Sequence, residues 1–375
     1  MMDGYGKSPD AALRFPPPLL SQGQACCGVR NSTPHSSGVS RLACGLFSKP
    51  SAKLGIHNRR GVALIIVLLM ISIIVAVTIQ LNRSMRSEVY EAANLSDGIR
   101  LRYVAQSGFY AGEALLLADK NSFDALTEDW AKTEMVALKS EGLFDNGSFN
   151  LRIEDEGGKI PVNRLVSGSG YNAPVRDLLL RLLTGPDFHL SQDQAGEIAD
   201  AIKDWIDGDD EVTGAGAEGA YYAGLERPYA PKNAPLDCIE ELLMIKGMTR
   251  ELFYGTGESP GLLLYLSVFG DGKININTAP KPVLRALSAE MTGDAVERLD
   301  EYRRDEKNNL ADPVWYSRIP GAAAWNIPAG LISVRSDAFR ITAVGLQGRM
   351  TQRITAAVKR EADRRKVKLL SWKVD

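Results

Sequence analysis

Histidine and cysteine are scarce in this chain, and their scarcity excludes several kinds of chemistry. The 375 residues include three histidines, His35, His57 and His189, and Cys238 is the only cysteine after residue 60. One cysteine cannot form an internal disulfide bond, and no CxxC pair is present to indicate a metal site. We therefore expect neither a histidine-rich metal site nor a Ser-His-Asp triad. We expect Cys238 to be a small buried residue on a helix.

Excess charge is lacking as well. The chain has 44 basic and 46 acidic residues, which gives a formal net charge of −2. A balance this close to neutral provides no general attraction to nucleic acid. Proline is absent between Val62 and Pro161, so one long helix can begin in the apolar segment there and continue beyond it.

An uncharged apolar run extends from Val62 to Val77, and residues 78–81 lengthen it to about 20 residues. A helix of that length crosses a hydrocarbon core of about 30 Å. Residues 11–60 contain seven basic and no acidic side chains, which favours an amino terminus left in the cytoplasm. The sequence therefore predicts a single membrane span, with the carboxyl-terminal bulk of the chain on the other side.

The segment before the span does not look like an ordinary secretory signal. No small-residue cleavage site follows the span, whereas Gly61 directly precedes it and comes after two arginines. The junction RRGVAL resembles the leader junction of type IV prepilins, which prepilin peptidase cuts after the glycine. The resemblance implies that residues 1–61 are removed and that the mature chain begins at Val62. Most pilins carry Phe or Met there, so the resemblance extends less well to N-methylation.

Residues 1–53 are rich in proline, serine and glycine and show no helical or strand periodicity. We therefore expect this segment to be disordered and to contribute nothing to the mature fold. Prepilin leaders are commonly much shorter than this. Two interpretations stay open: a long natural leader, or a true start of translation near Leu54, which we favour.

The fifth residue after the glycine is Ile66, where most pilins have glutamate. A carboxylate inside the membrane is costly and needs a partner. In the pilin family this glutamate is thought to meet the amino terminus of the neighbouring subunit, so a subunit that lacks it suits the filament tip. Among pseudopilins its absence marks the K type. The chain thus resembles the K-type minor pseudopilins of the type II secretion system.

Residue spacing predicts that the membrane helix continues well past the span. Apolar residues recur at steps of three or four, interrupted only by two polar positions. Glycines 98, 108 and 112 within this stretch are expected to permit curvature or close packing. The stripe comprises Met85, Val89, Ala92, Ser96, Ile99, Tyr103, Gln106, Tyr110, Ala114 and Leu117.

Strand-like segments lie on both sides of a long helical region. Residues 148–155 alternate as a strand, as do 338–344, 350–358 and 367–374, with a turn expected at 345–348. The predicted fold is α+β: a long amino-terminal transmembrane helix packed on a small antiparallel sheet, as in pilins, with a large inserted α-helical domain. We assign residues 82–160 and 331–375 to the pseudopilin domain and 161–330 to the insertion.

Helical patterns within the insertion occur at residues 175–183, 194–206, 236–245, 281–288 and 293–302. Two units, at 235–253 and 274–287, resemble helix-hairpin-helix folds that bind DNA, and Thr278 is the expected helix N-cap of the second. Phosphate binding requires a net positive face, and here basic and acidic side chains alternate. We therefore expect these units to be structural and expect no nucleic-acid partner.

One loop concentrates acidic residues among glycines. Like charges this close repel unless a cation lies between them, and Ca²⁺ favours such oxygen ligands. The spacing does not match an EF-hand, and an ordinary solvated acidic turn is the alternative. The segment resembles a stretch of the K-type family, which binds calcium, and that resemblance favours a Ca²⁺ site. The expected ligands are first Asp207, Asp209 and Glu218, and then Asp204, Asp210 and Asn233.

The resemblance implies a role in assembly and not in catalysis. A K-type protein would initiate or cap the periplasmic pseudopilus, with I-type and J-type minor pseudopilins, the inner-membrane secretion platform and prepilin peptidase as partners. It would be a single-pass inner-membrane protein with a cytoplasmic amino terminus and a periplasmic carboxyl-terminal domain. The alternative is a minor pilin of a type IV pilus or of a DNA-uptake machine.

Overall fold

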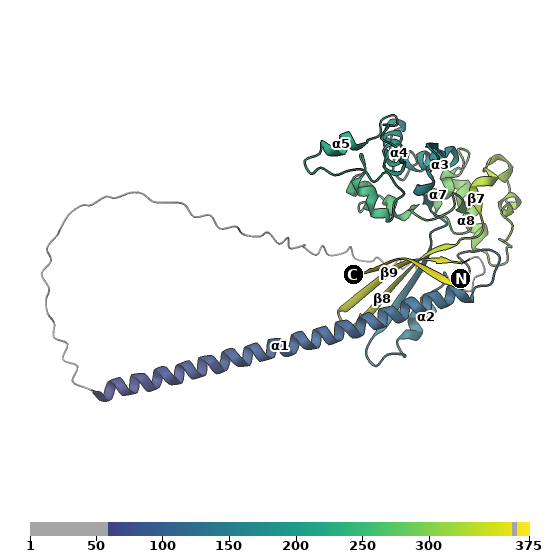
Figure 1. Ribbon diagram of the computed structural model, residues 1–375. Coiled ribbons are helices and arrows are strands. Elements are labelled where there is room, and N and C mark those ends of the chain that lie inside the picture. Colours follow the sequence, from purple (N-terminus) through teal and green to yellow (C-terminus); the bar gives the residue numbers. More distant parts are fainter. Residues whose placement is uncertain (1–58, 362–365) are drawn as a thin grey trace, which may run out of the picture. The chain divides into compact units, whose positions relative to one another are not determined.

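The computed structural model describes residues 59–361 and 366–375 (Figure 1). The chain divides into two units, Met1–Ile74 and Val75–Asp375. The predictions of disorder in residues 1–53 and of a start near Leu54 therefore lie outside the described residues. Of the predicted leader, only residues 59–61 are described, as the beginning of a helix.

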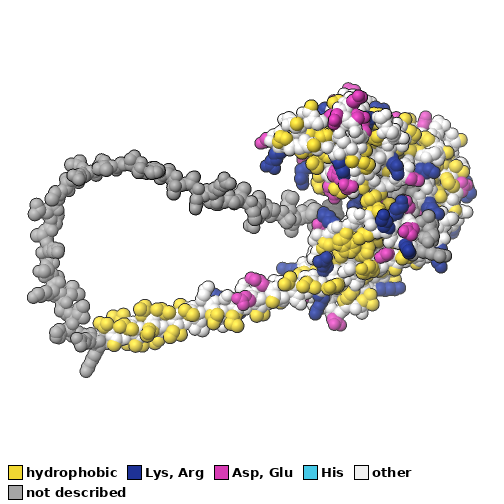
Figure 2. Space-filling view, viewed as in Figure 1, with side chains coloured by type: hydrophobic (Ala, Val, Ile, Leu, Met, Phe, Trp, Pro, Cys, Tyr) yellow, Lys and Arg dark blue, Asp and Glu magenta, His cyan; other side chains and the backbone are white. Residues whose placement is uncertain are grey.

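The first helix, α1, spans Arg59–Ala118 and is long and apolar enough over its first turns to cross a membrane. Its large apolar side chains from Val62 to Leu81 are exposed, and Figure 2 shows them as a continuous hydrophobic surface. The hydroxyl of Ser72 donates to the carbonyl oxygen of Leu68 (2.8 Å), so this polar group is satisfied within the helix. These features fit a single-pass membrane anchor.

The carboxyl-terminal part of α1 buries a different face from the predicted stripe. Its core side chains include Leu101, Val104, Ala105 and Phe109, whereas Tyr103 of the stripe is 65% exposed. The prediction that the apolar spacing continues as helix is confirmed. The stripe itself, including Val89, Ile99 and Tyr110, lies on the exposed side. Small residues decide which face is buried, because they let the helix approach the sheet closely.

Four antiparallel strands form the sheet against which α1 packs, in the order β1-β8-β9-β10. The predicted turn at 345–348 is wrong, because β8 continues to Gln347, which pairs with Met350. The chain reverses at Gly348, whose φ of 57° suits glycine. The strands are β1 (Ser148–Asp155), β8 (Ala338–Gln347), β9 (Met350–Arg360) and β10 (Val367–Val374); the short helix α2 (Glu134–Ser140) packs beside β1.

Glycine allows α1 and the sheet to touch. A Cβ atom on Gly345 of β8 would lie 2.7 Å from the carbonyl oxygen of Leu101, and one on Gly108 would lie 2.9 Å from the ring of Phe149. No neighbour lies within 4 Å of a Cβ placed on Gly98. Close packing is therefore the role of Gly108, and Gly345 acts in a strand and not in the expected turn.

The region between β1 and β8 has its own hydrophobic core, which runs from Ile160 to Val334 and also includes Ala125. The core beneath the sheet contains Ile153 and Phe339 on either side of it. The change from one core to the other falls between Ile153 and Ile160 and again between Val334 and Phe339. The longer helices of the insertion are α3 (Ala173–Leu183), α4 (Gln192–Ile206) and α8 (Gly293–Arg304).

The remaining elements of the insertion are short. They are α5 (Gly219–Ala223), α6 (Arg250–Tyr254) and α7 (Lys281–Ala286); the 3₁₀ turns η1 (Val162–Arg164), η2 (Ile239–Met244), η3 (Leu262–Leu264), η4 (Trp315–Arg318), η5 (Ala322–Ala324) and η6 (Ala329–Leu331); and the two-residue strands β2 (Ile160–Pro161), β3 (Val166–Ser167), β4 (Gly170–Tyr171), β5 (Leu266–Ser267), β6 (Ile274–Asn275) and β7 (Ile332–Ser333). β2 pairs in parallel with β5, and β6 pairs in parallel with β7.

Three local predictions within the insertion are wrong. The segment predicted as a helix at 236–245 is the 3₁₀ turn η2, and Cys238 is exposed at its N-cap. The N-cap of α7 is Pro280, which makes no side-chain capping bond. Thr278 instead donates its hydroxyl to Oδ2 of Asp155 (2.5 Å), a residue 123 positions away. Thr278 therefore forms a long-range hydrogen bond in place of the helix cap that local rules predict.

Asp155 stands at the corner where the chain leaves the sheet for the insertion. Its buried carboxylate accepts hydrogen bonds from Thr278, Asn275 and Ser336, at 2.5, 3.0 and 2.7 Å. Burial raises the pKa of this carboxyl to about 6, despite those donors. The polar groups of the insertion and of both adjoining strands therefore depend on one another at this corner.

The neighbouring residue, Glu156, is also buried, but its carboxylate forms ion pairs with two basic side chains. Its carboxylate accepts from Nε of Arg340 (2.7 Å) and from Nζ of Lys159 (2.8 Å), and the hydroxyl of Ser267 donates to it at 2.5 Å. Although burial acts in the opposite direction, these two cations lower the pKa of Glu156 to about 2. A buried charge paired in this way holds its neighbours in one arrangement.

The close contact at Gly345 yields a stability prediction. We expect Gly345→Ala to destabilise the folded chain by about 1–3 kcal/mol, because the added methyl meets the backbone of α1 and cannot be accommodated by a side-chain rotation. Gly98→Ala is the matched control and should stabilise the helix by about 0.5–1 kcal/mol. Melting curves of the chain in detergent measure both. Equal effects of the two substitutions would contradict the proposed packing role.

Candidate metal centre

Helix α4 brings the acidic loop to the surface of the insertion core. Ser191 caps its first turn by accepting from the backbone N–H of Gln194, whose side chain accepts in return from the Ser191 N–H. The helix ends at Asp207, which is its C-cap residue. Asp204 lies one turn earlier on the buried face, and the loop that follows returns to Glu218 at the N-cap of α5.

Three carboxylates converge at this point. One oxygen from each of Asp204, Asp207 and Glu218 lies within 4.8 Å of the others, and all three residues are buried. The aromatic rings of Trp205 and Tyr222 pack edge to face nearby, with centroids 5.3 Å apart, and both are buried. The acids are therefore held by a hydrophobic support, and they are not part of a loose solvated turn.

Several of these buried oxygens have no hydrogen-bond donor. In the described part of the chain, six buried side-chain polar atoms have no hydrogen-bond partner. Four of them lie in this loop or in the segment that contacts it: Oδ1 of Asp207, both carboxylate oxygens of Glu218 and Oδ1 of Asn233. A buried polar group without a partner costs free energy, and a buried charge costs more. All four atoms are acceptors, so a cation would satisfy each of them.

Electrostatics agrees with this geometry. Burial, followed by the nearby carboxylates of Asp204 and Asp207, raises the pKa of Glu218 to about 7. Burial also raises the pKa of Asp204. The donor set consists only of oxygen, which is the preference of Ca²⁺ and Mg²⁺ and not of the softer transition metals. The residues present therefore fit a hard divalent cation.

The other predicted ligands lie in the same loop but outside the tight group. Asp209 is half-buried, and its Oδ1 accepts from the N–H of Glu211 at 3.0 Å. Asp210 is exposed. The amide of Asn233 donates to the backbone oxygen of Asp209 (3.0 Å) and to Oδ1 of Asp210 (3.1 Å), which ties a distant segment to the loop. Asp204, a second choice from the sequence, is more central than Asp209.

Backbone groups, a glycine and a lysine from another segment hold the loop in place. The backbone N–H of Thr213 donates to Asp204 at 3.1 Å, and a Cβ on Gly216 would lie 2.1 Å from the Asp204 carboxylate. Nζ of Lys246 donates to the carbonyl oxygens of Ala215 (2.9 Å) and Gly216 (3.1 Å). Each partner comes from another part of the chain or from the backbone, so residue spacing alone contains no signal for it.

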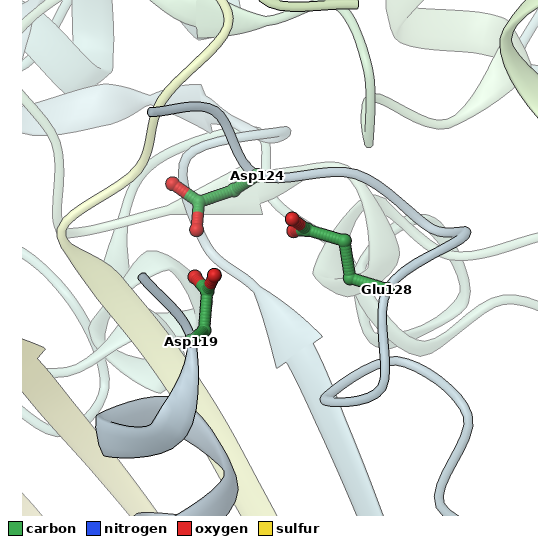
Figure 3. Close-up of side chains that lie close together, drawn as sticks. All are labelled: Asp119, Asp124 and Glu128. Carbon is green, nitrogen blue, oxygen red and sulfur yellow. The ribbon is translucent and has the colours of Figure 1, made fainter. Parts of the chain in front are cut away.

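A second acidic group, Asp119, Asp124 and Glu128, has similar spacing but a different chemistry. Figure 3 shows the three carboxylates turned toward one another, with oxygens within 4.8 Å. Arg360 donates to Asp119 at 2.7 Å and also to Asp124, and Glu128 accepts from the N–H of Ala125 and the indole of Trp130. Hydrogen-bond donors of the chain itself satisfy these carboxylates. We therefore interpret the group as a structural hydrogen-bond network and not as a candidate metal site.

Three cations of the hairpin units have partners within the chain. Lys246 directs its ammonium group at the carbonyl oxygens of the acidic loop. Lys281 pairs with Glu297, and Arg285 lies 3.7 Å from Asp187. Because these cations already have internal partners, they offer little to a phosphate backbone.

Comparisons with known proteins agree with this architecture. Two family models, both described as "Type II secretion system (T2SS), protein K", match residues 158–254 and 274–334. Type II secretion system protein K of Aeromonas hydrophila is 27% identical over 343 residues, covering 84% of this chain and 96% of that protein. The protein of the same name from Pseudomonas aeruginosa is 28% identical over 260 residues, covering 66% of this chain and 74% of its own length.

Among solved structures, the GspK-GspI-GspJ complex of the enterotoxigenic Escherichia coli type 2 secretion system contains a similar chain. The TM-score is 0.57 at 18% identity, and the match covers 78% of this chain and 99% of that one. A long helix with an exposed apolar amino-terminal part and a carboxyl-terminal part packed on a four-stranded sheet, together with a helical insertion, makes this chain a minor pseudopilin of a type II secretion system. It belongs to the type II secretion system protein K family.

The contrast between the two acidic groups yields a prediction about calcium. We expect Glu218→Gln to raise the melting temperature in chelator, because one of several crowded charges is removed, and to reduce the further rise caused by calcium. Glu128→Gln is the matched control: it lies in the group already satisfied by donors and should leave the calcium-dependent rise unchanged. Thermal melts in chelator and in excess calcium measure both effects. An equal calcium response in all three proteins would count against the site.

Proposed function

We propose that this minor pseudopilin initiates or caps the pseudopilus from its tip. The observation that carries the proposal is Ile66, which replaces the membrane carboxylate that other pilins use to engage a neighbouring subunit. Ile66 lies in the exposed apolar part of α1, where a charge would be costly. The inserted helical domain supports the same position, because a subunit with such an insertion is too wide to stack within a helical filament.

The partners we propose are minor pseudopilins of the I and J types and the secretion platform in the inner membrane. The structurally similar chain was solved in a GspK-GspI-GspJ complex of a type 2 secretion system. The exposed stripe of α1, which includes Val89, Ile99 and Tyr103, offers apolar side chains at helical spacing. Helices with that pattern pack together in the manner of coiled coils, and the membrane segments can continue the contact.

The membrane topology we propose is a single pass through the inner membrane, with a cytoplasmic amino terminus and a periplasmic carboxyl-terminal domain. The seven basic residues and absence of acids in residues 11–60 support it. Prepilin peptidase would release the mature chain by cutting between Gly61 and Val62. The protein acts as a structural subunit and not as an enzyme, and no nucleic acid is needed for that role.

For the acidic loop we propose one or more Ca²⁺ ions, held by Asp204, Asp207 and Glu218 with help from Asp209, Asp210 and Asn233. The unpartnered oxygens of Asp207, Glu218 and Asn233 support this proposal. The ion would supply the positive charge that lets buried carboxylates approach one another. Its role is to stabilise the inserted domain, since ligand binding to the folded state alone adds to stability.

Processing is the first test of this function. We expect Gly61→Leu to block maturation, because the small residue at the cleavage point is lost while the basic pair and the apolar span remain. Amino-terminal sequencing of the unsubstituted protein should begin at Val62. The same amino terminus in a strain that lacks prepilin peptidase would overturn the assignment.

The tip position predicts how the chain responds to a carboxylate at position 66. We expect Ile66→Glu to bring no gain in pseudopilus assembly, since a tip subunit does not engage a neighbour through this residue. The substituted chain should also insert less well, given the cost of a charge within the span. Secretion assays and the location of the labelled protein in the filament measure the outcome. Improved assembly, with labelled protein along the whole filament, would contradict the capping role.

A further inference from the structure

Lys203 lies against the acidic loop and is itself buried. It precedes Asp207 by one helical turn, and the two side chains are 8% and 2% exposed. Its ammonium forms an ion pair with Oδ2 of Asp207 and donates to the hydroxyl of Thr213 at 2.8 Å. The sequence pattern did not identify Lys203 as part of this site.

The pairing uses only one side of the Asp207 carboxylate. Oδ2 faces the lysine, while Oδ1 has no donor and stays available. The other nearby lysine, Lys246, binds backbone carbonyl oxygens and no carboxylate of the group. Among the described residues around Asp204, Asp207 and Glu218, Lys203 is thus the cation in direct contact with a clustered carboxylate.

We propose that Lys203 is a resident counter-ion, which partly neutralises the acidic loop when no metal is bound and opposes the entry of a divalent cation. This inference rests on the proposed calcium site. A unit positive charge in contact with a buried carboxylate attracts that carboxylate strongly, and it repels a divalent cation that binds to the same carboxylate. The lysine therefore lowers the affinity for calcium and reduces how far the fold depends on it.

The alternative role for such a residue is to orient Asp207 as a ligand. Hydrogen bonds to metal ligands generally raise metal affinity, and their loss weakens binding about 10–100-fold. The two roles predict opposite signs for the effect of removing the charge. A full positive charge in a buried cluster outweighs the orienting effect of one hydrogen bond, so the counter-ion role prevails here.

The test replaces Lys203 by methionine, which keeps the length and apolar stem of the side chain. In the full chain in detergent, Lys203→Met should bind calcium about tenfold or more tightly by titration calorimetry. It should also melt at a lower temperature in chelator. Lys232→Met is the matched control, because Lys232 pairs with Asp237 and Glu241, outside the acidic group. It should leave calcium affinity unchanged.

A double variant guards against simple misfolding of Lys203→Met. Lys203→Met combined with Glu218→Gln removes one charge of each sign and should recover the melting temperature lost in chelator. Weaker or unchanged calcium binding in Lys203→Met would overturn the inference. So would an unchanged melting temperature in chelator.

The two proposals fail in different ways. If the unsubstituted chain takes up no calcium, the metal site is wrong, and the chelator measurements alone decide the role of Lys203. If the unsubstituted chain binds calcium but Lys203→Met does not bind it more tightly, the metal site stands and the counter-ion role falls.

Discussion

The fold depends on one corner of the sheet, where the chain leaves for the insertion and returns. β1 ends and β8 begins as antiparallel neighbours, with Asp155 opposite Phe339. Because the two ends of the insertion are adjacent, a domain with its own core can be added there without disturbing the register of the strands. The buried carboxylate of Asp155 fixes this arrangement by accepting hydrogen bonds from the insertion and from the returning strand.

Two acidic groups in this chain show why residue type and proximity do not by themselves define a metal site. Both bring three carboxylates within the same distance. Near α1, Arg360 and several N–H groups donate to the carboxylates, and the group is complete as it stands. Beside α4, Glu218 has no donor for either oxygen. The decisive difference is the number of donors supplied by the rest of the fold, and those donors are remote in sequence.

Periodicity and the apolar run were enough to predict the membrane helix, the strands and the inserted helical region. Residue spacing also located the acidic loop, although it ranked Asp209 above Asp204. Predictions failed where a residue remote in sequence determines a side chain's role. Thr278 donates to Asp155 instead of capping a helix, and Gly345 allows α1 to approach the sheet instead of forming a turn. The apolar stripe did not indicate the buried face of α1, because Ala105, Gly108 and Gly112 on that face allow close approach and add little hydrophobicity. Such pairings contain no local signal.

The position of the insertion at adjacent ends of β1 and β8 has a mechanical consequence. Traction on the insertion would pull the end of β1 and the start of β8 in the same direction, so the load falls on their attachment to the rest of the subunit and not on the pairs between them. Arg360, at the end of β9, donates to Asp119, which directly follows α1, and to Asp124 in the loop beyond it. Tension applied to the insertion is therefore shared with a third strand and with the helix that forms the stalk of the subunit.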